Sequence, residues 1–147
     1  MERTDVETLL YDINPSRLRL RQVEYLLTGL ATAGANPQYP VTNLEREGRS
    51  YDTSDPTFRA VERHEERIQR LADEAKMLIR KLQVYEEWLS LLDAESNSMI
   101  EYVYIQNNTV SKYCQEHFMP RTTYYRKIER ALNILAENPI TVAVTVA

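Results

Sequence analysis

A seven-residue repeat between residues 61 and 92 constrains the fold more than any other feature of this sequence. Apolar side chains recur at two positions of the repeat, and Glu, Arg and Lys surround them. This spacing is typical of one face of a long α-helix. The two seam positions hold Val61, Ile68, Ala75, Leu82 and Leu89, and His64, Leu71, Leu78, Tyr85 and Leu92. The repeat predicts a helix over 55–93, with Ser54 or Asp55 as its cap and Pro56 in its first turn.

Two uses of this seam are open at the level of sequence. The seam can pack against other helices of the same chain, or it can form a coiled coil with a second copy, which would make the protein a homodimer through the long helix. Ala72, Ile79 and Trp88 widen the apolar stripe beyond a two-stranded seam, so both uses are compatible with the pattern.

The segments on either side of this helix complete an all-α prediction. Apolar residues at helical spacing predict a pair of N-terminal helices within 1–34, separated at Asn14-Pro15-Ser16 because proline disfavours helical geometry in the residue before it. Residues 35–54 have no apolar period and are predicted to be a linker. A further short helix is expected around Met99–Tyr104 and is ended by Asn107-Asn108. The uncharged tail 138–147 is β-prone, and either a strand or a frayed end fits it.

The C-terminal stretch 109–135 carries the functional signal. Its pattern predicts a helix over 110–117, a turn at Phe118-Met119-Pro120, and a second helix over 121–137 that Asn138-Pro139 stops. Cys114 supplies the small residue that two steeply crossing helices need. Tyr124, Ile128, Leu132 and Leu135 recur at helical spacing and predict the buried face of the second helix. The spacing indicates a helix-turn-helix domain over 94–137.

The other face of the second helix carries the chemistry that reads DNA. Arg can donate two hydrogen bonds to guanine, and Thr or Tyr can bond phosphates or touch a thymine methyl group. Arg130 lies one turn further along, where a phosphate contact is expected. The candidate DNA-binding residues are Lys112, Arg121, Thr122, Thr123, Tyr125, Arg126, Lys127 and Arg130.

The distribution of charge agrees with this assignment, although the net charge is −4. Residues 109–147 contain five basic and three acidic side chains, and the remaining residues contain 13 basic and 19 acidic ones. Positive charge is therefore placed at the C-terminal end, and we expect the acidic remainder to face away from a duplex.

The stretch PRTTYYRKIERALNIL resembles region 4 of bacterial sigma factors, and more closely the phage late-transcription regulators of the ArpU and RinA type. Thr123, Tyr124, Tyr125, Arg126 and Arg130-Ala131-Leu132 match the second helix of those families. Lys112-Tyr113-Cys114 stands where they carry a Glu-Ile-Ala or Trp-x-x-Ile-Ala block. Pro120 replaces their serine cap, and His117-Phe118 replaces a Leu-Gly turn. The resemblance covers roughly residues 54–137. It implies a sequence-specific regulator of phage or prophage late genes, with double-stranded DNA and RNA polymerase as partners.

Other function classes have less support in the sequence. His64 and His117 lie in separate elements without a nucleophile or metal-ligand spacing, so we expect no enzyme activity, cofactor or metal. The lone Cys114 excludes an internal disulfide. An N-terminus without a signal-peptide core and the lack of a long apolar run predict a protein of the bacterial cytoplasm, away from membranes. Two alternatives remain: a DNA-recognition subunit of a phage packaging machine, and a coiled-coil interaction module that binds no DNA.

Overall fold

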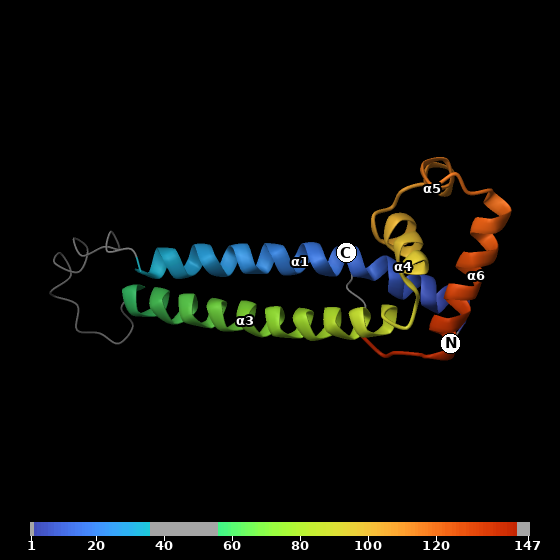
Figure 1. Ribbon diagram of the computed structural model, residues 1–147. Helices are drawn as coiled ribbons and strands as arrows, with labels where there is room; N and C mark the ends of the chain where they lie inside the picture. Colours follow the sequence, from blue (N-terminus) through green and yellow to red (C-terminus); the bar gives the residue numbers. More distant parts are fainter. Residues whose placement is uncertain (1, 36–55, 144–147) are drawn as a thin grey trace, which may run out of the picture. The chain divides into compact units, whose positions relative to one another are not determined.

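The computed structural model describes residues 2–35 and 56–143, and every regular element in these ranges is helical (Figure 1). The all-α fold class is therefore confirmed for the described part of the chain. The elements are α1 (Arg3–Ala35), α3 (Pro56–Leu89), α4 (Ala94–Ile100), the π-helix η1 (Glu101–Ile105), α5 (Val110–Glu116) and α6 (Arg121–Glu137). The linker predicted at 35–54 lies outside the described residues except for Ala35, and so do the predicted caps Ser54 and Asp55. Within the described ranges, no helix is long and apolar enough to cross a membrane.

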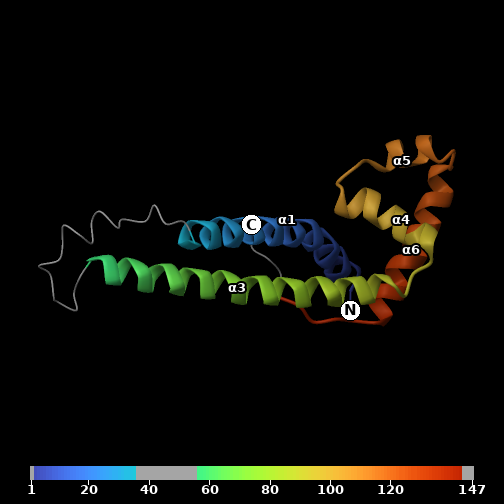
Figure 2. The ribbon, with the colours of Figure 1, turned by 60° about the vertical axis from the view of Figure 1, so that its left-hand side comes forward.

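The chain divides into two compact units by its internal contacts. Unit 1 comprises residues 1–18 and 78–147, and unit 2 comprises residues 19–77. The segment 94–137, predicted as the DNA-binding domain, lies in unit 1 together with the first part of α1 and the last part of α3. The helices α4 and α5 both pack against α6 in this unit (Figure 2).

Apolar residues from every helical element of unit 1 meet in one core. Val6, Leu10 and Ile13 recur at helical spacing in α1 and are at most 1% exposed, so they form one buried face. The remaining buried members of this core are Leu9, Tyr85, Trp88, Leu92, Met99, Ile100, Tyr104, Ile105, Tyr113, Cys114, Tyr124, Ile128, Ala131, Leu132 and Leu135. The core is therefore assembled from segments that are far apart in the sequence.

The break predicted at Asn14-Pro15-Ser16 is wrong, because α1 is one helix that contains Pro15. A proline in a helix interior costs about 3 kcal/mol, mainly through the lost backbone donor and a steric clash. The burial of Ile13 and Ser16 on either side of Pro15 offsets this cost. The Ser16 hydroxyl also donates to the backbone oxygen of Asp12 at 2.8 Å. Tertiary packing thus keeps the chain helical where its local preference is to break.

A buried polar cluster joins α1 to α3 within unit 1. The Asp12 carboxylate is almost fully buried and lies 2.6 Å from Lys81 Nζ, while the Tyr85 hydroxyl donates to it at 2.7 Å. Ser16 Oγ is 3.3 Å from the same carboxylate. Burial, the hydrogen bond to Asp12 and its negative charge all raise the pKa of Tyr85. Lys81, Tyr85 and Ser16 therefore all contact the Asp12 carboxylate.

The side chain of Trp88 connects α3 to the C-terminal end of α6. Its indole Nε1 donates to the backbone oxygen of Asn138 at 2.8 Å and to that of Leu135 at 3.2 Å. The Leu135 oxygen also accepts from the backbone N–H of Asn138 at 3.2 Å, so the indole adds a second donor at this end of α6. Trp88 is 2% exposed, so it also fills the core at this point.

The seam of the long helix is mostly buried within the single chain. Leu71, Ala75, Leu78, Tyr85 and Leu92 are buried, and His64, Ile68, Leu82 and Leu89 are half-buried. Val61 is the exposed member of the seam. In unit 2, Arg19 of α1 forms a two-pronged ion pair with Glu74 of α3, with N–O distances of 2.6 and 2.9 Å. The Arg19 guanidinium lowers the pKa of Glu74.

Asp93 marks the start of α4, and Asn107 lies just past the end of the π-helix η1 that follows it. The Asp93 carboxylate accepts from the backbone N–H of Ser96 at 3.1 Å and caps α4. Hydrogen bonds from the Ser96 side chain and from its backbone N–H lower the pKa of Asp93. The helix continues as η1 and ends near Asn107, whose φ of 58° lies in the left-handed region. The predicted stop at Asn107-Asn108 is confirmed, whereas the helix begins five residues before Met99. In the tail, 139–143 form no strand, and Ile140 and Val142 pack against the core.

Buried tyrosines make the stability of unit 1 sensitive to alkaline pH. Burial raises the pKa of Tyr85, Tyr104, Tyr113 and Tyr124 above the ordinary value of 10.0. The unfolded chain releases these protons near pH 10 while the folded chain holds them. Stability is therefore retained below pH 10 and lost as pH rises above it, by up to about 1.4 kcal/mol per pH unit for each tyrosine.

Urea denaturation near neutral pH and above pH 10 measures this effect. The Tyr124→Phe variant is the matched control, because it removes one ionisable group and should lose part of the pH dependence. A free energy of unfolding that is equal on both sides of pH 10 would contradict the expectation.

Candidate nucleic-acid interface

The helices predicted over 110–117 and 121–137 are present as α5 and α6, within one residue at each end. Thr109 caps α5, and its hydroxyl oxygen accepts from the backbone N–H of Lys112 at 3.2 Å. Pro120 is the first residue before α6 and has extended backbone, which its fixed φ favours. Pro120 supplies no side-chain hydrogen bond to the start of α6, so among the described residues this helix has no N-cap acceptor of its own.

A cluster of aromatic rings fixes α5 against α6. Tyr113 is 2% exposed, and its ring centroid lies 5.7 Å from that of Tyr124, 5.4 Å from that of Tyr102 and 4.1 Å from that of His117. Cys114 is buried beside it as a free thiol, as expected for the small residue of a helix crossing. The sequence pointed to Cys114 and Tyr124 but gave no signal that Tyr113 is the centre of the cluster.

The turn between the helices contains a phenylalanine in a conformation that glycine favours. Phe118 has φ of 50°, in the left-handed region that bulky residues rarely adopt. The backbone N–H of His117 donates to Tyr113 O at 3.0 Å, and that of Met119 donates to Cys114 O at 2.9 Å. The turn therefore keeps a tight geometry without the glycine of the sequences it resembles.

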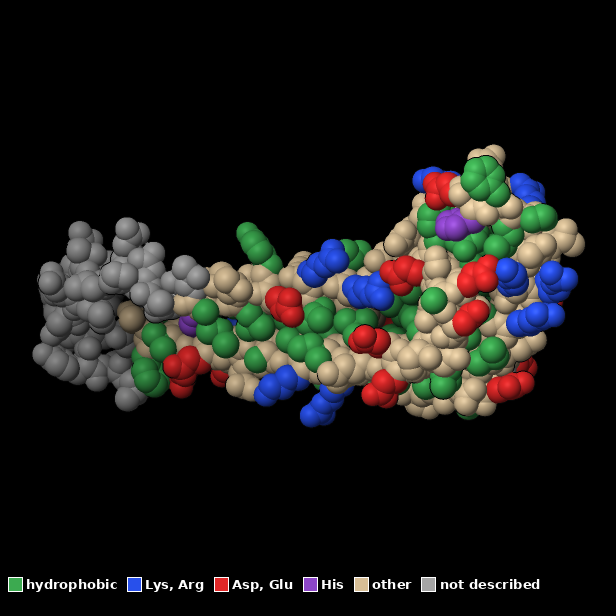
Figure 3. All heavy atoms as spheres, viewed as in Figure 1, with side chains coloured by type: hydrophobic (Ala, Val, Ile, Leu, Met, Phe, Trp, Pro, Cys, Tyr) green, Lys and Arg blue, Asp and Glu red, His purple; other side chains and the backbone are tan. Residues whose placement is uncertain are grey.

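The face of α6 predicted to be buried is buried. Tyr124, Ile128, Leu132 and Leu135 are each at most 2% exposed, and Ala131 joins them. The opposite face is exposed and holds Arg121, Thr122, Tyr125, Arg126, Glu129, Arg130 and Asn133. Lys and Arg side chains line this edge of the molecule along α6 (Figure 3). Against three arginines, this row has one carboxylate, Glu129, so it is electropositive.

The structure places the eight predicted site residues in three different settings. Arg126, Arg130, Thr122 and Tyr125 are exposed on the α6 row, and Lys112 is exposed on α5. Arg121 is exposed but hydrogen-bonded to the Ser111 hydroxyl of α5. Thr123 is half-buried. Lys127 is half-buried as well, and its Nζ lies 2.6 Å from Glu95 Oε1 of α4.

These settings change what each side chain can do. The Glu95 carboxylate neutralises Lys127 locally, so Lys127 has less charge to offer a phosphate than Arg126 or Arg130. The bond to Ser111 orients Arg121 across the start of α6. Glu95 and Ser111 were missed by sequence reasoning, because both belong to other helices and only the fold brings them to α6.

Among the described residues, side chains of the kinds that hold metal ions form no group of three or more, and a groove lies in unit 1. No group of three or more His, Cys, Asp or Glu side chains within 2–35 and 56–143 is placed to hold a metal ion. A groove of about 620 Å³ in unit 1 is lined by Ile13, Tyr85 and Asn97 among others. Three charged side chains line this groove: Arg17 and Glu101, which pair with each other at 2.8 Å, and Glu86.

Comparison with known proteins shows that a family model matches this chain. No curated protein and no solved structure matches the chain. A family model described as "Protein of unknown function (DUF1492)" matches residues 50–136, which include α3, α4, η1, α5 and all of α6 except its last residue. The chain therefore belongs to the DUF1492 family.

Proposed function

We propose that this protein is a sequence-specific DNA-binding regulator of transcription that presents α6 to the major groove. The observation that carries the proposal is the exposed row of α6, where Arg121, Arg126 and Arg130 lie opposite a fully buried face. An α-helix fits the major groove, and arginine makes the commonest specific contact there, to guanine. The resemblance to ArpU and RinA regulators supports transcription of phage or prophage late genes as the process, with RNA polymerase as a further partner.

Individual side chains have different proposed roles. Arg126 lies near the middle of the row and reads a base, while Arg130 lies one turn further along and contacts a phosphate. Thr122 and Tyr125 lie beside Arg121 and Arg126 and make contacts to phosphate or to a thymine methyl group. The backbone N–H groups at the start of α6 suit a phosphate oxygen.

The burial of the α3 seam favours one of its two possible uses. Leu71, Leu78 and Tyr85 are buried without a second chain, so we propose that the seam is used mainly inside the chain. A homodimer would then form through other surfaces. Sedimentation of the full chain, alone and with DNA, tests this point.

Selection of bound duplexes from random DNA, followed by binding to the selected site over a range of salt concentrations, tests the function. We expect Arg126→Ala to weaken binding to the selected site by roughly 1–3 kcal/mol while leaving non-specific binding nearly unchanged. Arg130→Ala should weaken binding to all duplexes and reduce the salt dependence by about one phosphate contact. Lys127→Ala should have a smaller effect than Arg130→Ala, because Glu95 already pairs with Lys127.

Lys76→Ala is the matched control, since it removes one exposed positive charge from α3 in unit 2. The proposal fails if the parent chain binds no duplex, or if Arg126→Ala binds the selected site as tightly as the parent does. Ring-sized oligomers in sedimentation would instead favour a packaging subunit.

A further inference from the structure

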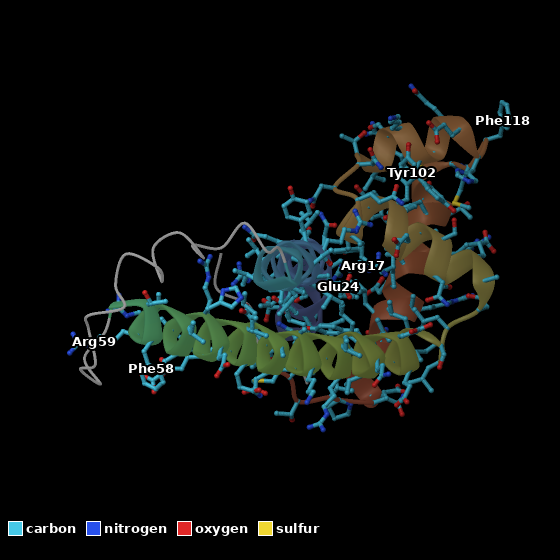
Figure 4. The ribbon with its side chains drawn as sticks, turned by 90° about the vertical axis from the view of Figure 1, so that its left-hand side faces the viewer. Arg17, Glu24, Phe58, Arg59, Tyr102 and Phe118 are labelled. Atoms are coloured by element: carbon cyan, nitrogen blue, oxygen red, sulfur yellow. The ribbon has the colours of Figure 1, made fainter. Side chains whose placement is uncertain are left out.

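Phe118 has an exposed aromatic side chain that takes no part in the hydrophobic core. It is 95% exposed, and the next most exposed large apolar side chain among the described residues is Tyr25 at 79%. The ring points out from the turn between α5 and α6, away from the rest of the chain (Figure 4). Burial of apolar surface therefore does not explain a phenylalanine at this position.

The backbone conformation at Phe118 is energetically unfavourable for this residue type. Its φ of 50° is a conformation that glycine adopts freely and asparagine tolerates, but that is strained for an aromatic residue. Both neighbours hold the strain in place through the hydrogen bonds to Tyr113 O and Cys114 O. His117 also stacks on Tyr113, with ring centroids 4.1 Å apart. Strain at a position that the surroundings fix is found at functional sites more often than elsewhere.

The surroundings of Phe118 indicate what its ring would meet. It lies two residues before Pro120, which precedes α6, and the exposed cations Lys112 and Arg121 lie on the two helices that the turn connects. The ring therefore lies within a few residues of cations that would attract a polyanion. The apolar surfaces that duplex DNA offers are the 5-methyl group of thymine in the major groove and the deoxyribose of the backbone.

We propose that Phe118 is an apolar contact of the DNA interface, with its ring against the methyl group of a thymine. This inference rests on the proposed function and deepens it: the chain would read not only guanine through arginine but also a T·A pair at one edge of its site. It assigns a role to the residue that stands where the resembling regulators have glycine.

Two variants separate a binding role from a structural one. Phe118→Gly and Phe118→Asn both relieve the left-handed strain and remove the ring, so each should melt at the same temperature as the parent or higher. We expect both to bind the duplex selected by the parent about tenfold more weakly. Tyr25→Ala, which removes an exposed aromatic ring from unit 2, is the matched control and should bind that duplex as the parent does.

Replacing each thymine of the selected duplex with uracil, one at a time, removes single methyl groups. One uracil should weaken the parent and have no effect on Phe118→Gly. If both variants bind weakly but every uracil duplex affects parent and variants equally, the ring contacts deoxyribose and the thymine assignment is overturned. If both variants bind as tightly as the parent, the ring does not touch DNA and a protein partner is its target. A parent chain that binds no duplex would overturn the proposed function itself.

Discussion

A fragment of residues 94–147 is expected to be unfolded in isolation, although it contains all the candidate DNA-binding residues. The core around α6 also needs Val6, Leu10 and Ile13 of α1, together with Tyr85, Trp88 and Leu92. Each fully buried apolar side chain contributes roughly 1.5–3 kcal/mol, while the whole stability of a domain is roughly 5–15 kcal/mol. The summed contribution of these six side chains is as large as the whole net stability of a domain, so the fragment should not remain folded without them.

Circular dichroism and thermal melting of the fragment measure this expectation. The informative control is a chain in which residues 19–77 are replaced by a short Gly/Ser linker, which keeps both parts of unit 1 and should melt cooperatively. A fragment of 94–147 with full helicity and a cooperative transition would show that α6 and its neighbours form a domain of their own. The segment that the family model matches, residues 50–136, likewise lacks the part of α1 that completes the core.

Asp12→Ala is expected to destabilise the folded chain by about 3–5 kcal/mol. The substitution removes the carboxylate that lies 2.6 Å from Lys81 Nζ, and the Lys81 side chain is only 10% exposed. It also removes the acceptor of the Tyr85 hydroxyl. Water compensates a buried charge less well than an exposed one, which is why breaking a buried ion pair is more damaging than breaking an exposed pair.

Glu95→Ala provides the matched comparison, because the Glu95–Lys127 pair has the same 2.6 Å distance but side chains that are 47% and 35% exposed. We expect it to cost less than about 1 kcal/mol. Urea denaturation of both variants at neutral pH measures the two effects. Equal losses would show that the burial of Lys81 is not what makes the Asp12 pair important.

Local patterns predicted the helices of the C-terminal region well. The apolar spacing of α6 predicted its buried face, and Asn138-Pro139 predicted its C-terminal end. Both signals depend on residues within a few positions of one another in the sequence. Pro15 shows the opposite case. Its local preference is to break a helix, but the burial of Ile13 and Ser16 depends on partners that periodicity alone does not identify.

The candidate site was predictable as a set of exposed cations but not as a network. The sequence placed Arg126 and Arg130 on the exposed face of α6 through spacing alone. It could not show that Lys127 pairs with Glu95 or that Arg121 bonds Ser111, since these partners lie 32 and 10 residues away. The left-handed backbone at Phe118 also escaped prediction, because the residue type argues against the conformation.

The position of Trp88 gives the protein a built-in optical probe. It is the one tryptophan of the chain, so its fluorescence is not mixed with that of another indole. Its indole is hydrogen-bonded to carbonyls at the C-terminal end of α6, and the 17 residues of that helix separate it by about 25 Å from the end at which Arg121 and Phe118 lie. DNA at the N-terminal end of α6 would not touch the indole. A change in its emission on binding would therefore report that the packing around the C-terminal end of α6 has changed, without any label on protein or DNA.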